Sequence, residues 1–196
     1  MDSVAGFASI AAVGVSLQAF LETAFREVPP VSGTATTAVL VRSNDLDLAA
    51  GTVIVFPALS ILLYRVDFNK TMRASWSAVG NVDGTAHLPL DLHYLLTAWA
   101  DNAQHEHQIM GRAMQALETI GALSGPLLHP TGDWEPGEAV QLYLEDIGTD
   151  DLMRIYDALQ ANFRLSVPYI ARVVVVGGID FDPSADVTTV VTGIRP

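Results

Sequence analysis

Apolar side chains near the start of the chain recur at helical spacing. This spacing predicts a buried helix that runs to Glu27 and is stopped by Pro29-Pro30. The uncharged run from Ser3 to Leu21 also raises a membrane helix or a secretion signal as alternatives. A signal peptide starts with positive charge, whereas this chain has no cation before Arg26. We therefore expect a helix of the protein core, with the apolar stripe Phe7, Ile10, Leu17, Leu21, Ala24 and Val28.

Three β-prone runs follow this helix. Ala38–Arg42 and Thr52–Phe56 are rich in β-branched residues and are predicted to be short paired strands. A further strand is expected over Leu59–Phe68, because apolar side chains alternate toward its far end while Arg65 and Asp67 face the other way.

The clearest alternation of apolar and polar residues lies over Leu88–Ala98 and predicts a strand with one apolar and one polar side. Asp101 or Asn102 can cap a following helix, which is expected to end at Gly125-Pro126. The rest of the chain predicts a strand over Glu138–Leu144, a short helix from Thr149 or Asp150 to Leu159, and a valine-rich strand over Tyr169–Val176. Helices between strands indicate an α/β or α+β fold, with one mixed sheet covered by helices in a single domain over residues 1–178.

Residues 179–196 are expected to form a separate C-terminal extension. An acidic, turn-like piece with Asp180, Asp182 and Asp186 precedes the β-prone stretch Val187–Thr192. A strand set off in this way either folds back on its own sheet or adds to the edge of a neighbouring subunit. The sequence leaves both possibilities open.

Composition narrows the choice of partners. The chain has 196 residues, of which 50% are hydrophobic, so it can build a real core. It carries 22 acidic against 10 basic residues, a formal charge of −12, and Lys70 is its single lysine. We therefore expect neither nucleic acid nor an anionic membrane as a partner. There is no cysteine, which excludes disulfides, thiolate nucleophiles and zinc–thiolate sites and is compatible with an intracellular location.

The sequence contains no motif with the spacing that a metal site or a catalytic site requires. His105-Glu106-His107 lacks a second histidine four residues after the first, so the two rings diverge on a helix and a polar first turn is the simpler interpretation. The oxygen-rich segment Asp180–Val191 lacks the glycine and glutamate that a calcium loop needs. No nucleophile elbow and no phosphate-binding glycine loop is present. We expect no metal and no cofactor.

Asp91 and His93 lie on the same side of the clearest strand, and Glu145 and Asp146 end another. A general acid–base pair among them is an alternative, but the polar side of an amphipathic strand explains Asp91 and His93 more simply. We expect no catalytic residue.

A combination of segments points to one family. The segments are Leu63-Tyr64-Arg65-Val66 with Asn69 and Arg73, then Leu88–Ala98, then Gly111-Arg112-Ala113-Met114-Gln115. Together they resemble the cap, or tail-terminator, family of phage-tail-like contractile injection systems. Ile10–Val13 fits the first helix of that family, Arg164–Tyr169 fits the approach to its final strand, and the resemblance runs from Phe7 to Val176. One departure is Asp45-Leu46-Asp47-Leu48, a short acidic substitute for a Pro-rich stretch.

The resemblance implies a structural protein, not an enzyme. Members form a six-fold ring on the distal end of the inner tube and sheath, where they stop polymerisation and fix particle length. Tube protein, sheath protein and further copies of the chain are the implied partners, and assembly in the cytoplasm as part of an injection particle is the implied location. A small acidic adaptor module that forms no ring is the alternative.

Five residues are the candidates for contacts with other proteins. Arg65, Asn69 and Arg73 lie where the polar side of a strand leaves the core, and arginine can bind a neighbour's carboxylate with two hydrogen bonds. An ion pair of Arg65 with Asp67 or Asp91 within the chain is the alternative. Val187 and Val190 are candidates through the β-propensity of the extension.

Overall fold

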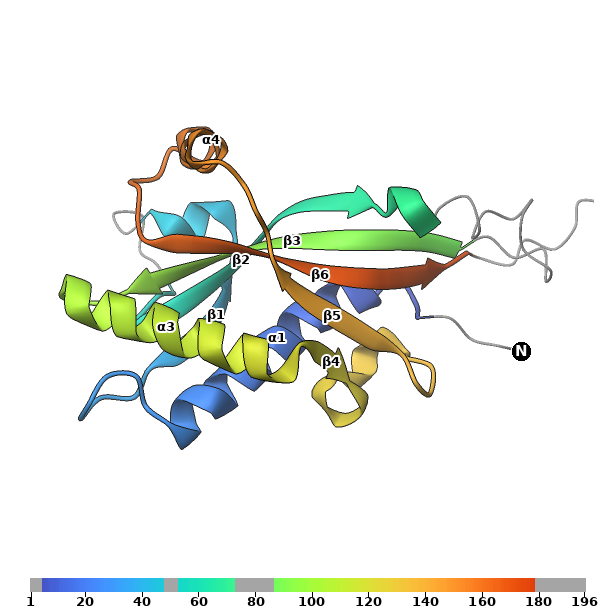
Figure 1. Cartoon of the computed structure of the whole chain (residues 1–196), viewed down its shortest axis with the longest axis horizontal. Coiled ribbons are helices and arrows are strands. Elements are labelled where there is room, and N and C mark those ends of the chain that lie inside the picture. Colours follow the sequence, from blue (N-terminus) through green and yellow to red (C-terminus); the bar gives the residue numbers. More distant parts are fainter. Residues whose placement is uncertain (1–4, 48–52, 73–86, 179–196) are drawn as a thin grey trace, which may run out of the picture.

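The computed structural model describes residues 5–47, 53–72 and 87–178, and its centre is a curled sheet of six strands (Figure 1). The strand order is β1-β2-β3-β6-β5-β4. β1 pairs with β2 in parallel, and the other neighbouring strands pair antiparallel. This confirms the expected mixed sheet. The strands are β1 (Thr37–Val41), β2 (Ala58–Phe68), β3 (His87–Trp99), β4 (Ala122–Ser124), β5 (Ala139–Leu144) and β6 (Ser166–Gly177).

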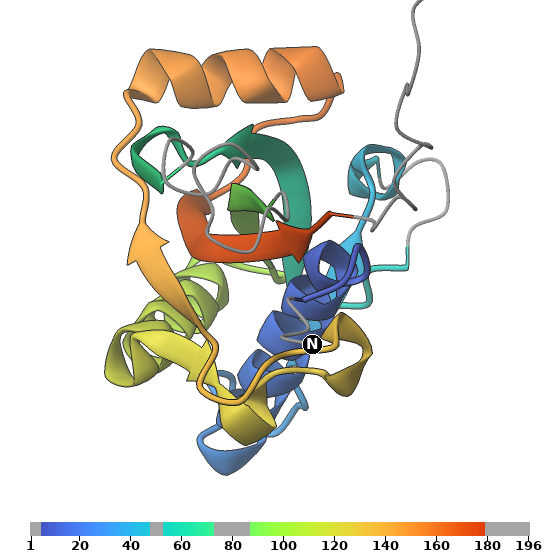
Figure 2. The same cartoon turned by 90° about the vertical axis from the view of Figure 1, so that its right-hand side faces the viewer.

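Two long helices, α1 (Ser9–Glu27) and α3 (Ala103–Ile120), cover one face of the sheet, which we call the α1/α3 face (Figures 1 and 2). Alternate residues of β3 point into this core, and Leu92 and Leu96 are both fully buried. The α1 stripe from Val13 to Phe25 packs against them, as expected. The two ends of the expected stripe differ: Phe7 and Val28 lie outside the helix and are exposed.

The opposite face, which we call the α4 face, is covered by α4 (Thr149–Leu159) at one end (Figures 1 and 2). There Tyr156 of α4 belongs to a second apolar cluster with Leu62, Leu95 and Trp99. Farther along, the α4 face carries polar side chains instead. The two faces of the same central strands are therefore built from different chemistry.

The end of α3 corrects one expectation. Asn102 caps the helix as predicted, since its side chain accepts a hydrogen bond of 2.9 Å from the backbone N–H of His105. The helix ends at Gly121 and not at Gly125-Pro126. Gly121 adopts a left-handed conformation with φ 62°, which glycine tolerates, and its carbonyl accepts from the N–H of Leu142 at 2.8 Å. The next three residues can therefore pair with β5 as strand β4.

The predicted strand over Thr52–Phe56 is wrong in its described part, residues 53–56, and Thr52 lies outside the described residues. Val55 is 74% exposed, whereas Ile54 is buried. β1 pairs instead with Ala58–Leu62, all buried. Where both faces of a sheet are covered, its inner strands favour apolar residues on both sides. Ala58–Leu62 meets this requirement better than residues 53–56.

Short 3-10 turns complete the described chain at η1 (Ser43–Leu46), η3 (Gly125–Leu127) and η4 (Pro130–Gly132). Within the described ranges, none of the helices has the length and apolar character needed to cross a bilayer. The long apolar helix α1 is accounted for by its burial against the sheet.

Candidate functional site

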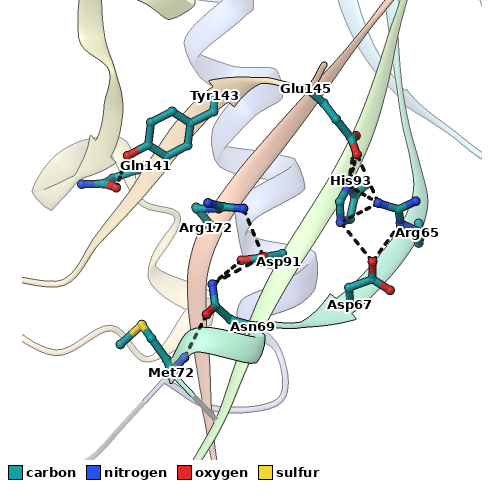
Figure 3. A network of polar contacts seen from close by, with 10 residues as sticks. All are labelled: Arg65, Asp67, Asn69, Met72, Asp91, His93, Gln141, Tyr143, Glu145 and Arg172. Atoms are coloured by element: carbon teal, nitrogen blue, oxygen red, sulfur yellow. Dashed lines mark hydrogen bonds and ion pairs between the residues drawn. The ribbon is translucent and has the colours of Figure 1, made fainter. Parts of the chain in front are cut away.

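Six charged or titratable side chains lie together on the α4 face, next to the area that α4 covers (Figure 3). β2 and β3 each supply two of them, at positions two residues apart and therefore on one side of the strand. β6 and the residue after β5 supply the others. We call this group the polar strip: Arg65, Asp67, Asp91, His93, Glu145 and Arg172.

His93 and Glu145 form the buried end of the polar strip. The His93 Nδ1 atom lies 2.9 Å from Glu145 Oε1, and the exposed fractions of the two side chains are only 5% and 8%. Arg65 Nη2 lies 3.1 Å from the same carboxylate oxygen, and Arg65 Nε lies 3.0 Å from Asp67 Oδ2. The His93 Nε2 atom is 3.5 Å from Asp67 Oδ2. His93 is thus enclosed by two carboxylates and one guanidinium.

Tyr64 adds a hydroxyl to this end. Its Oη donates a hydrogen bond of 2.7 Å to Glu145 Oε2. Burial raises the pKa of Tyr64, and the hydrogen bond to Glu145 raises it further, because both favour the neutral phenol. Tyr64 therefore stays protonated and acts as a donor that orients the Glu145 carboxylate.

Asp91 forms the other end of the strip. It accepts a hydrogen bond of 3.1 Å from Asn69 Nδ2, and Arg172 Nη2 lies 3.4 Å from its second oxygen. Asn69 Oδ1 in turn accepts from the backbone N–H of Met72 at 3.1 Å, just after β2 ends. Asn69 is buried, so it connects Asp91 to the turn that begins there.

The polar side of β3 is not a solvent face, which corrects the simpler interpretation of the alternation. His93 is 4% exposed and Asp91 is 9% exposed. His93 contacts the carboxylates of Glu145 and Asp67, and Asp91 is paired with Arg172 of β6. Buried ionisable groups persist where hydrogen bonds and opposite charges pair them.

The contacts of the strip join side chains from different strands of one chain. A general acid or base needs a free lone pair or proton directed at a substrate. Here the carboxylate oxygens of Glu145 and Asp91 are engaged by side chains of the same chain. The expected alternative for Arg65, an ion pair with Asp67, is present.

Three surface hollows of the described residues have none of the six strip residues in their walls, although the third is lined by the neighbouring Tyr64. One of about 470 Å³ lies between α1 and α3, with Phe20, Arg112 and Ile120 in its wall. One of about 400 Å³ lies beside the end of α1, and one of about 440 Å³ lies where β1 and β2 separate. Arg112 makes a hydrogen bond of 2.9 Å to the carbonyl of Ala24, so it serves to join the two helices.

The remaining candidates fall into two groups. His105, Glu106 and His107 lie in the first turn of α3, where Glu106 pairs with Arg164 at 3.3 Å, and the described residues contain no cluster of three metal-binding side chains. Arg73, Val187, Val190 and the segment Asp180–Val191 lie outside the described residues.

One contact was missed by the sequence analysis. The Arg164 guanidinium lies 4.4 Å from the ring centre of Trp99 and 5.9 Å from that of Phe56. Such stacking stabilises a cation over an aromatic face and closes one end of the α4 face. Arg164 and the two rings are far apart in the sequence, and no local spacing signals their contact.

A family model described as "Pvc16 N-terminal domain" matches residues 12–191. None of the curated proteins is significantly similar to the chain.

Two cryo-EM structures have a similar fold. The PVC sheath/tube terminator of an extracellular contractile injection system, in its extended state, has a TM-score of 0.54 at 20% identity over 93% of this chain. The tube-terminating cap of the anti-feeding prophage has a TM-score of 0.52 at 19% identity over 95% of this chain. The chain spans 62% and 60% of the length of these two proteins.

Proposed function

Because the chain belongs to the Pvc16 N-terminal domain family, we propose that it is a structural cap, or tail terminator, of a contractile injection system. In this role, copies form a six-fold ring on the distal end of the inner tube and sheath, stop polymerisation and fix the particle length. The family match over residues 12–191 is the observation that carries the proposal. The resemblance of the β2, β3 and α3 segments supports it from the sequence side.

The fold supports the same function. The two similar structures are titled as a sheath/tube terminator and a tube-terminating cap, and both have a similar fold that aligns over more than nine tenths of this chain. The end of a helical tube exposes a surface that would otherwise recruit the next ring. A cap must match this surface on one side and present a different one on the other.

The surface offers apolar contacts that a binding protein needs. Large apolar side chains are exposed at several places, and aromatic and aliphatic anchors of this kind contribute most of the binding energy at protein interfaces. They include Phe7, Val53, Val55, Leu144 and Phe163, which are between 53% and 89% exposed.

The polar strip supports a structural role over catalysis. His93 and Asp91, the residues an enzyme would use, are held in ion pairs and hydrogen bonds within the chain. The protein is therefore proposed to be no enzyme and to need no cofactor. Its partners are tube protein, sheath protein and further copies of itself, and it assembles in the cytoplasm into an injection particle.

Arg65 and Arg73 are the proposed polar contacts to the tube. The Arg65 side chain is 47% exposed despite its two ion pairs, so part of it remains accessible to a neighbour. Asn69 is buried and accepts a hydrogen bond from the backbone N–H of Met72, the last described residue before Arg73. Charge reversal by Arg73→Glu is expected to weaken binding to tube protein, and unchanged binding would exclude this contact.

Deletion of the gene tests the function directly. Particles purified from the deletion strain should vary in length or lack an intact distal end in electron microscopy, and a tagged copy should label one end of the tube. Complementation with the unaltered chain is the control. Normal particles after deletion would exclude a cap, whereas a monomer that never binds tube protein would favour the adaptor alternative.

A further inference from the structure

One half of β2 has an open edge in the described part of the chain. β1 pairs with β2 only from Ala58 to Leu62, where its register ends at Val41. β2 continues to Phe68 and is paired on its other side with β3, with a bulge in the register between Leu63 and Arg65. Over Leu63–Asp67, none of the described strands lies on the β1 side of β2. We call these residues the β2 half-edge.

A hollow marks the place where this half-edge begins. Its volume is about 440 Å³, and its wall includes Val41 at the end of β1, Leu63 and Tyr64 of β2, and Leu159 of α4. Farther along, Val66 is 43% exposed. The backbone hydrogen-bonding groups of a strand edge, beside an apolar hollow and a half-exposed valine, form a site for another strand.

The chain that leaves β6 can reach this site. β6 and β2 are both antiparallel to β3, so they run in the same direction and end at the same end of the sheet. A strand outside β2 lies three strand spacings from β6, about 14 Å. The end of β6 pairs with His87, three residues from Leu90, the partner of Phe68, which adds about 10 Å along the sheet. Residues 179–186 extend to at most about 26 Å and therefore span the gap.

We propose that residues 187–192 of the same chain form a seventh strand, antiparallel to β2, on the β2 half-edge. The six residues Val-Thr-Thr-Val-Val-Thr are uncharged and β-branched, and they are long enough to cover the five residues of the half-edge. Entry at the Phe68 end sets the antiparallel direction. A segment tethered by a short linker has an effective concentration in the millimolar range, which favours its own sheet over that of a neighbour. Val187 and Val190 then contact β2 of their own domain.

Cysteine cross-linking in the full chain tests the strand, and the absence of native cysteines removes all background. Val66→Cys is combined in turn with a cysteine at each position from 187 to 192. Under mild oxidation, an intramolecular disulfide should form best at the one tail position directly opposite residue 66. It should be weaker at the positions two residues away on the same face and absent farther off, because a disulfide needs Cβ atoms about 4 Å apart. The matched control places the first cysteine at Val55, which is 74% exposed and away from the half-edge. It should yield several-fold less cross-link at every position.

A mixing experiment distinguishes pairing of the tail with β2 of its own chain from pairing with β2 of another copy. Chains with Val66→Cys alone are mixed with chains that carry a tail cysteine alone, and covalent dimers should stay at the level of the Val55→Cys control. Dimers in excess of this control, without intramolecular cross-links, would overturn the proposal in favour of strand exchange between copies. Equal yields at all six tail positions, or none, would also overturn it.

Hydrogen exchange provides a readout that needs no cysteine. Truncation after Gly178 should increase exchange at about half of the amides of the β2 half-edge, since alternate amides of an antiparallel strand point to each neighbour. The amides of Ala58–Leu62, which pair with β1, serve as the internal control. Unchanged exchange in the half-edge would overturn the proposal. Because each of these measurements uses the isolated chain, a negative result leaves the cap function itself untouched.

Discussion

The two faces of β3 show two ways to bury the same strand. On the α1/α3 face, Leu92 and Leu96 are buried by side chains of α1 and α3 and need no particular partner geometry. On the α4 face, beyond the area under α4, His93 and Asp91 are almost as deeply buried, but each depends on specific atoms of distant residues. The first face gains stability from apolar area, and the second fixes which strands and loops lie together. The comparison predicts different responses to substitution on each face.

The largest effect is expected on the apolar face. Leu96→Ala removes a fully buried side chain from the main cluster and should lower the free energy of unfolding by about 3 kcal/mol, since a cavity remains. Urea unfolding followed by circular dichroism measures the change. Val55→Ala, at an exposed position, is the control and should shift it by less than about 0.5 kcal/mol. Equal losses at both positions would contradict the assignment of the core.

Removal of Glu145 should cost somewhat less. Glu145→Ala leaves His93, Arg65 and Tyr64 without their common acceptor, and we expect a loss of about 2 kcal/mol in the free energy of unfolding. Asp151→Ala removes a carboxylate that pairs with Arg154 at the surface and should be close to neutral. A Glu145→Ala protein as stable as the Asp151→Ala control would show that the polar strip contributes nothing to the fold.

Alkaline pH should destabilise the fold through tyrosines on both faces whose pKa is raised by burial, Tyr94 on the α1/α3 face and Tyr64 on the α4 face. Burial raises the pKa of Tyr94, whose ring lies in the main core, so the folded state keeps a proton that the unfolded state releases near pH 10. Stability should therefore fall as the pH rises above about 10, by at most about 1.4 kcal/mol per pH unit for this group. Tyr94→Phe should flatten the decline when unfolding is measured between pH 9 and 11. If the free energy of unfolding of Tyr94→Phe falls with pH as steeply as that of the unaltered chain, groups other than Tyr94 cause the alkaline sensitivity.

The smallest effect on folding is expected for Arg65. Because its side chain is 47% exposed, Arg65→Gln should lower the free energy of unfolding by less than about 1 kcal/mol. Binding to tube protein should weaken measurably in a pull-down if this arginine contacts the tube. A loss of folding comparable to that of Glu145→Ala would mean that Arg65 acts within the polar strip alone.

Local patterns predicted most of the elements. The alternation over Leu88–Ala98, the Asn102 cap and the helix that ends at Leu159 were all confirmed, because each depends on residues close in the sequence. The strand predicted over Thr52–Phe56 was wrong because Ala58–Leu62 competes better for the same place beside β1. The early end of α3 depends on the left-handed Gly121 and its bond from Leu142.

Only part of the polar strip could be predicted from the sequence. The shared side of Asp91 and His93 followed from their spacing, but their burial did not, because the compensating groups come from other strands. Glu145 is 52 residues away from His93, and the contact exists only once β5 and β6 have paired. A single sequence contains the charges but not the pairing that brings them together.

The strand order also has a consequence for synthesis on the ribosome. β6 lies in the middle of the sheet between β3 and β5, yet it is the last described strand along the chain. Until residue 177 emerges, the β2–β3 hairpin and the β4–β5 pair cannot join, and both expose edges that could pair wrongly. The nascent protein therefore completes its sheet late and in a single step, by inserting its central strand between two halves made earlier.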